Sequence, residues 1–327
     1  MSPLSERPRI HPVYQEACSY SKEYIYPLFE KNVTKSLEEQ RKFIIGLRAQ
    51  NDKPFVKTKL KDVLRSKQQM DKVNTTIFRP LGTEEQVLPV TLLIHGGGWL
   101  MGNTNSYSKL AIDLCITSHS AVVFVEYSLS PEVKFPIALE ECFSVVSWIL
   151  QYGRSIHLNS DRLVVTGDSA GGNMAAALPI MAKDRGLPHA IQAQVLLYPV
   201  LSPQVGMYPS HALFSDGAYG LGKHHLDLLH KFYFPQPVTT PYAAPLLATA
   251  DQLKGLPTAL ILTCEADILR DEGEAYAAQL LNAGVDTVGI RMMGVIHGYL
   301  VDDYPDLPSY ITSLHLICDF IKSVQTI

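Results

Sequence analysis

The chain has 327 residues, of which 46% are hydrophobic and 18% are charged, and its formal net charge is −4. This composition is typical of a globular protein with enough apolar material for a sizeable core. The near-balanced charge gives no reason to expect nucleic acid or an anionic membrane as a partner. No apolar run is long enough for a membrane span.

The five cysteines are scattered, and no two have the spacing of a metal or redox motif. Reduced, buried thiols in a cytoplasmic protein are therefore expected. The first residues lack the apolar segment that a signal peptide needs, which agrees with that location. The oligomeric state is left open between a monomer and a homodimer.

Residues 1–70 are polar, and their apolar positions recur at helical spacing, as at Tyr24, Leu28 and Leu47. Two or three amphipathic helices are expected there. No glycine-rich linker follows them, which favours N-terminal cap helices packed on the main body over a separate domain.

Strands and helices alternate from residue 71 to residue 327. Strands are expected at 73–78, 87–94, 121–125, 163–166, 194–198, 259–264 and 287–292, and helices at 107–118, 137–151, 170–183, 223–234, 272–283 and 309–324. Pro179 is expected to kink or shorten its helix. Continuous apolar strands that alternate with helices imply an α/β fold with a mostly parallel sheet and helices on both faces. Residues 202–240 break this rhythm and are expected to be an insertion.

A Gly-x-Ser-x-Gly motif at 167–171 follows one of the expected strands and precedes a helix. Glycines on either side of a serine let a strand turn sharply into a helix, which presents the serine hydroxyl above the sheet. Ser169 is therefore a candidate nucleophile. Asp168 is interpreted as a support for this turn.

A serine hydroxyl needs a base, and that base needs an acid to orient it. His297 follows the last expected strand and Asp267 follows the one before it, so both lie where ligands collect in an α/β sheet. Three further acids, Glu265, Asp271 and Glu272, compete for the same role as Asp267. Asp271 and Glu272 also suit the first turn of the next helix, where the helix dipole favours acids. The order Ser169, Asp267, His297 is that of α/β-hydrolases.

A run of glycines at 96–98 follows an earlier strand. Residues without side chains allow backbone N–H groups to approach a substrate oxygen closely. Gly97, Gly98 and Ala170 are therefore candidate donors of an oxyanion hole.

Five segments resemble the hormone-sensitive lipase family of carboxylesterases, particularly its microbial and fungal members. They are His-Gly-Gly-Gly-Trp at 95–99, Tyr-Ser-Leu-Ser-Pro-Glu at 127–132, Gly-Asp-Ser-Ala-Gly-Gly at 167–172, Asp-Ile-Leu-Arg-Asp-Glu-Gly at 267–273 and Ile-His-Gly at 296–298. The resemblance implies an α/β-hydrolase fold and hydrolysis of short- to medium-chain acyl esters of small molecules without a cofactor. It also implies a helical cap, which residues 1–70 and 202–240 would supply.

Two positions depart from the family pattern. Ser128 stands where the family usually has arginine, and Glu126 stands where it usually has aspartate. Both changes are expected to affect ion pairing in the scaffold.

Aromatic side chains are candidates for the substrate pocket, although each could equally be a packing residue. Trp99 and Tyr107 follow the glycine run, and Tyr208, Phe214, Tyr219 and Phe232 lie in the expected insertion. A further group there, His224, His225, Asp227 and His230, raises the question of a metal. His225 and Asp227 would not share a helix face, so no metal is expected.

The same residues leave two other functions open. An acyl-enzyme could pass its acyl group to another alcohol, or an acyl group could be eliminated in a biosynthetic reaction. A ligand receptor on a hydrolase scaffold is a third reading, which the presence of His297 disfavours.

Overall fold

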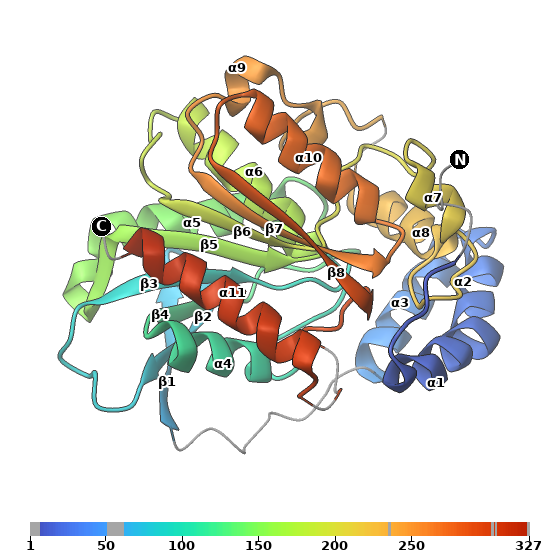
Figure 1. Cartoon of the computed structure of the whole chain (residues 1–327), viewed down its shortest axis with the longest axis horizontal. Coiled ribbons are helices and arrows are strands. Elements are labelled where there is room, and N and C mark those ends of the chain that lie inside the picture. The colour runs from blue at the N-terminus through green and yellow to red at the C-terminus, as the bar shows by residue number, and fades with distance from the viewer. Residues whose placement is uncertain (1–6, 51–61, 235–236, 302–303, 305, 326–327) are drawn as a thin grey trace.

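An eight-stranded sheet forms the middle layer of the molecule, in the order β1-β2-β4-β3-β5-β6-β7-β8 (Figure 1). The computed structural model describes residues 7–50, 62–234, 237–301, 304 and 306–325. The strands are β1 (Val63–Met70), β2 (Val73–Pro80), β3 (Leu88–Ile94), β4 (Ala121–Val125), β5 (Leu158–Asp168), β6 (Ala193–Leu197), β7 (Thr258–Ala266) and β8 (Thr287–Ile296). β2 runs antiparallel to both β1 and β4, and the other neighbours are parallel.

Helices cover both faces of the sheet (Figure 1). One face carries α4 (Ser108–Ser118) and α11 (Pro308–Gln325), and the other carries α5 (Ile137–Tyr152), α6 (Ala170–Asp184) and α10 (Arg270–Asn282). Because they are covered on both sides, β4 and β6 are buried along their whole length. The expected α/β fold with a mostly parallel sheet is confirmed.

The remaining helices lie outside these two layers or are short. They are α1 (Pro12–Tyr20), the π-helix η2 (Ser21–Ile25), α2 (Tyr26–Val33), α3 (Leu37–Gln50), the 3₁₀-helix η4 (Gly153–Ile156), α7 (Pro209–Leu213), α8 (Lys223–Tyr233), the 3₁₀-helix η5 (Pro245–Leu247) and α9 (Ala250–Leu253). α1–α3 gather at one end of the molecule beside α7 and α8 (Figure 1).

These two groups of helices share apolar contacts. Phe29 of α2 and Ile44 of α3 are buried in one cluster with Leu100, Leu228 and Phe232. The hydroxyl of Tyr26 donates a 2.6 Å hydrogen bond to the carbonyl of Ser215. Segments almost 200 residues apart in sequence therefore pack together beside the carboxyl ends of the strands.

Two local expectations differ from the structure. β1 was not expected, because its sequence is polar and buries only its two ends, Val63 and Met70. It can be polar because it is an edge strand, with a partner on one side only. Pro179 does not shorten its helix, since α6 continues to Asp184.

The start of α6 lies very close to the end of β3. A Cβ atom added to Gly171 would be 2.0 Å from the carbonyl oxygen of Ile94 and 2.6 Å from that of His95. Only a residue without a side chain permits this approach. It brings the β5–α6 turn beside the loop that follows β3.

We expect Gly171→Ala to lower the free energy of unfolding by at least about 3 kcal/mol, because two backbone segments would have to separate. Gly46→Ala is the matched control, since Gly46 lies in α3 with no atom within 4 Å of the added Cβ. That change should stabilise the protein by up to about 1 kcal/mol. Urea unfolding of both variants checks this, and equal stability of Gly171→Ala and wild type would contradict it.

Candidate active site

Ser169 occupies the sharp turn between β5 and α6. Its backbone has φ 52° and ψ −116°, a strained conformation for a residue with a side chain. Its N–H donates to the carbonyl of Leu197 on the neighbouring strand β6, at 2.9 Å, which holds the turn against the sheet. The hydroxyl is thereby presented at the carboxyl ends of the strands.

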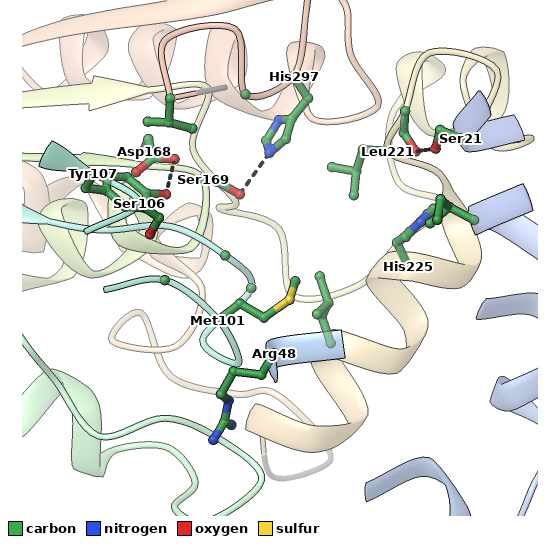
Figure 2. A pocket seen from close by; sticks show the side chains of 18 of the residues that line it. Ser21, Arg48, Met101, Ser106, Tyr107, Asp168, Ser169, Leu221, His225 and His297 are labelled. Carbon is green, nitrogen blue, oxygen red and sulfur yellow. Dashed lines mark hydrogen bonds between the residues drawn. The ribbon is translucent and has the colours of Figure 1, made fainter. Parts of the chain in front are cut away.

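His297 and Asp267 come to Ser169 from the ends of two other strands. The Nε2 atom of His297 is 3.0 Å from the Oγ atom of Ser169 (Figure 2). Its Nδ1 atom is 2.8 Å from Oδ2 of Asp267. A carboxylate only accepts hydrogen bonds, so Nδ1 carries the proton and Nε2 can accept from the serine hydroxyl. The second oxygen of Asp267 accepts from the N–H of Leu269.

The three competing acids are bonded elsewhere. Glu265 accepts from the N–H of Gly294, Asp271 from that of Ser210, and Glu272 from that of Leu201. Asp267 is the acid that the fold places against His297.

The loop after β3 takes an unusual backbone path. Gly97, Gly98 and Trp99 all have positive φ, at 91°, 64° and 59°. A Cβ atom on Gly98 would lie 2.5 Å from the side chain of Leu229 in α8. Both glycines face the same cavity as Ser169, and Ala170 is the first residue of α6.

Asp168 joins the serine turn to this loop. Its two oxygens accept from the N–H of Gly96 at 2.8 Å and from the hydroxyl of Tyr107 at 3.0 Å. Tyr107 in turn accepts from the same N–H of Gly96 at 2.9 Å. Burial raises the pKa of Asp168 to about 6, although both donors act to lower it.

A cavity of about 710 Å³ opens over Ser169. Its walls come from the N-terminal helices, α8, the glycine loop and the segment after β8. Side chains of these elements that line it include Cys18, Ser21, Ile25, Phe29, Arg48, Met101, Ser106, Tyr107, Glu126, Leu221, His225, Leu229, Val301 and Tyr304. Several of these surround Ser169 in Figure 2.

Of the aromatic residues expected at the pocket, Tyr107 lies in the cavity wall. Trp99 is fully buried and stacks on Tyr233 at 4.5 Å between ring centroids. Phe214 is fully buried against Tyr219, whose hydroxyl bonds to the carbonyl of Pro8. None of these three lines the cavity, because each packs against other aromatic rings instead.

The histidines of α8 have separate roles. His225 lines the cavity, and its Nδ1 atom accepts from the N–H of Gly222 at the start of the helix. Burial lowers the pKa of His225 to about 3 and that of His230 to about 4. Within the described ranges, no group of three or more His, Cys, Asp or Glu side chains is arranged to hold a metal ion.

Residues 91–301 match the family described as alpha/beta hydrolase fold. The chain belongs to the α/β-hydrolase fold family. The resemblance to its hormone-sensitive lipase branch is confirmed, and the protein is a carboxylic ester hydrolase.

Several proteins similar to this esterase are themselves described as esterases. It is 32% identical to an esterase of Gibberella moniliformis over 69% of this chain and 71% of that one. It is 31% identical to the carboxylesterase NlhH of Mycobacterium tuberculosis over 65% of this chain and 67% of the other. Among solved structures, a fungal esterase from Rhizomucor miehei is 36% identical with a TM-score of 0.84, covering 98% of this chain and 99% of that one.

None of the helices in the described part of the esterase has the length and apolar composition needed to cross a bilayer. The five cysteines are all free and buried, as expected.

Sequence reasoning missed most of the cavity wall. Met101, Leu221 and Leu229 are ordinary apolar residues, and nothing in their spacing says that they face Ser169. The sequence indicated Arg48 and Glu126 only weakly. A charged side chain near a glycine loop, or one that departs from a family pattern, is a candidate functional residue. The cavity exists only because distant segments meet.

The buried Asp168 should make stability depend on pH. Its pKa is raised above its value in the unfolded chain, near 4, so the folded state binds the proton more tightly. Relative to Asp168→Asn, wild type should therefore lose on the order of 3 kcal/mol of stability as pH rises from about 4 to about 6.

Urea unfolding of wild type and Asp168→Asn between pH 4 and pH 7 measures this difference. Tyr107→Phe removes a donor that lowers the pKa of Asp168, so it should move the loss to higher pH. If the difference in free energy of unfolding between wild type and Asp168→Asn stayed constant from pH 4 to pH 7, the raised pKa of Asp168 would be contradicted.

Proposed function

We propose that the esterase cleaves its substrate through an acyl-enzyme, with Ser169 as nucleophile, His297 as base and Asp267 as the residue that orients the base. The observation that carries this proposal is the continuous chain of hydrogen bonds from Asp267 through His297 to Ser169. The strained turn at Ser169 supports it, because such strain is typical of functional positions.

The reaction follows from these positions. Nε2 of His297 takes the proton of the serine hydroxyl while Oγ attacks the ester carbonyl. Asp267 stabilises the imidazolium that forms. His297 then protonates the departing alcohol, and a water molecule repeats the sequence on the acyl-enzyme to release the acid.

The proposed oxyanion hole consists of the N–H groups of Gly97, Gly98 and Ala170. The first two lie in the glycine loop beside Ser169, and the third stands at the positive end of the dipole of α6. Each such donor is worth roughly 3 kcal/mol of transition-state stabilisation. Asp168 supports this role, since its bond to Gly96 holds the loop beside the nucleophile.

The expected cap of residues 1–70 is too long, because β1 (Val63–Met70) pairs with β2 in the sheet. We further propose that the helices within residues 7–50 and the segment 202–234 form a cap over a catalytic domain that begins with β1. These helices pack together and supply much of the cavity wall over Ser169. Such a closed volume favours small esters with short- to medium-chain acyl groups. The free, buried thiols support a reducing, cytoplasmic location.

Replacement of the triad residues tests the mechanism. Ser169→Ala should lower kcat for p-nitrophenyl butyrate by at least about 10³-fold, and Asp267→Asn by roughly 10³- to 10⁴-fold, because the base loses its correct tautomer. Asp271→Asn is the matched control, since Asp271 bonds to Ser210 and should leave kcat within a factor of three. Wild-type rates in Ser169→Ala, with an unchanged circular dichroism spectrum, would overturn the assignment.

The acyl-length proposal has its own test. A series of p-nitrophenyl esters from acetate to palmitate keeps one leaving group while the acyl chain grows. We expect kcat/KM to peak within the short to medium chains and to fall for palmitate, whose chain exceeds the cavity. A maximum at palmitate would contradict the proposal.

A further inference from the structure

The cavity extends from Ser169 in two directions with different chemistry. Figure 2 shows Leu221 and His225 on one side of Ser169, and Ser106 and Tyr107 on the other. The first side, the cap arm, is lined mainly by apolar side chains such as Ile25, Phe29, Leu221 and Leu229. The second side, the polar arm, consists of Ser106 and Tyr107 together with Asn103, whose N–H donates to Ser106, and Glu126, which accepts from Thr104, the neighbour of Asn103.

Glu126 is the charged group of the polar arm. Its Oε1 atom accepts hydrogen bonds from both the N–H and the hydroxyl of Thr104. Its Oε2 atom accepts none from the described residues. Burial raises the pKa of Glu126, while Arg65 and Lys67 on β1 and the Thr104 N–H lower it. Glu126 thus lines the cavity with one carboxylate oxygen that accepts no hydrogen bond from the described residues.

The other charged groups that line the cavity do not neutralise Glu126. The guanidinium of Arg48 bonds to Glu132 and to the carbonyls of Leu100 and Ser130. Asp168 is occupied by Gly96 and Tyr107. Across the described ranges, Glu126 has no cation at ion-pair distance, because Arg65 and Lys67 act on it only from farther away.

Ser128 supplies no cation to Glu126. At this position, where the family resemblance led us to expect an arginine, both the N–H and the hydroxyl of Ser128 donate to Glu141 at 2.6 Å. Instead of pairing in the scaffold, as the sequence led us to expect, Glu126 is left available to a ligand. Glu126 is half-buried, and its Oε2 atom can accept a hydrogen bond from a substrate donor without losing a protein partner.

The direction of the reaction decides which part of an ester reaches Glu126. The departing oxygen must lie against Nε2 of His297, which is close enough to His225 of the cap arm to help lower the pKa of that histidine. Tyr304, which also lines the cavity, packs on Tyr14 of α1 at 4.7 Å between ring centroids. The alcohol therefore leaves on that side. The acyl group stays on Ser169 and extends into the polar arm.

We propose that Glu126 determines acyl specificity by accepting a hydrogen bond from a hydroxyl or ammonium group on the acyl chain of the substrate. This inference rests on the proposed function, since it needs an acyl group attached to Ser169. Hydrogen bonds to a charged acceptor are worth enough to change kcat/KM by roughly tenfold or more. The substrate class is thus an ester of a hydroxylated or amino-bearing short- to medium-chain acid.

The test compares p-nitrophenyl esters of ω-hydroxy acids with those of the unsubstituted acids, from butyrate to octanoate. For wild type, the ratio of the two kcat/KM values should peak at roughly tenfold at one chain length. Glu126→Gln should reduce this peak to within threefold of unity. Glu126→Asp should move the peak to a chain one methylene longer, because its carboxylate is set back by that length.

Glu141→Gln is the matched control. Glu141 also accepts from one N–H and one hydroxyl, but it does not line the cavity, so the wild-type ratio should persist. Ratios are taken within one preparation, so a general loss of activity or folded protein cancels. A flat ratio in wild type, or a peak unchanged in both Glu126 variants, would overturn the inference. Failure of wild type to hydrolyse any of the unsubstituted esters would instead overturn the proposed function.

Discussion

The close packing of α6 against the end of β3 sets the geometry of the whole site. Gly171 lies so near the carbonyls of Ile94 and His95 that no Cβ atom fits between them. This contact places Ser169, two residues earlier, beside the glycine loop that begins one residue after His95. A nucleophile and backbone donors from separate strands can act on one carbonyl group only if the two segments stay at this distance.

Polar contacts then fix the relative orientation of the two segments. Asp168 bonds to Gly96 and to Tyr107, and all three are buried around the same N–H group. A carboxylate in such a place is costly, which its raised pKa expresses. This loss of stability is retained because Asp168 aligns the strained Ser169 with the glycine loop. Functional sites commonly keep such destabilising features.

The helices outside the sheet decide what can enter. Leu229 of α8 packs against Gly98. The helix that covers the cavity therefore also contacts the glycine loop. In the polar arm, Glu126 contributes a carboxylate to the cavity wall. The esterase therefore combines an apolar arm under the helices with a polar arm near β4, and the chemistry of each arm follows from a different part of the chain.

The sequence by itself predicted strands β2 to β8, the alternation of strands and helices after residue 71, and Ser169, Asp267 and His297 as candidates, but it missed β1. Each of these depends on local pattern: apolar runs for buried strands, and a glycine-flanked serine for a sharp turn. The sequence also favoured Asp267 over Asp271 and Glu272, which suit the first turn of the next helix. Only the tertiary structure showed that Glu265 bonds to Gly294 and placed Trp99 in the core. It alone brought Leu229 and Glu126 to one cavity. Those outcomes depend on contacts between residues far apart in the chain, and periodicity carries no information about which distant face a side chain meets.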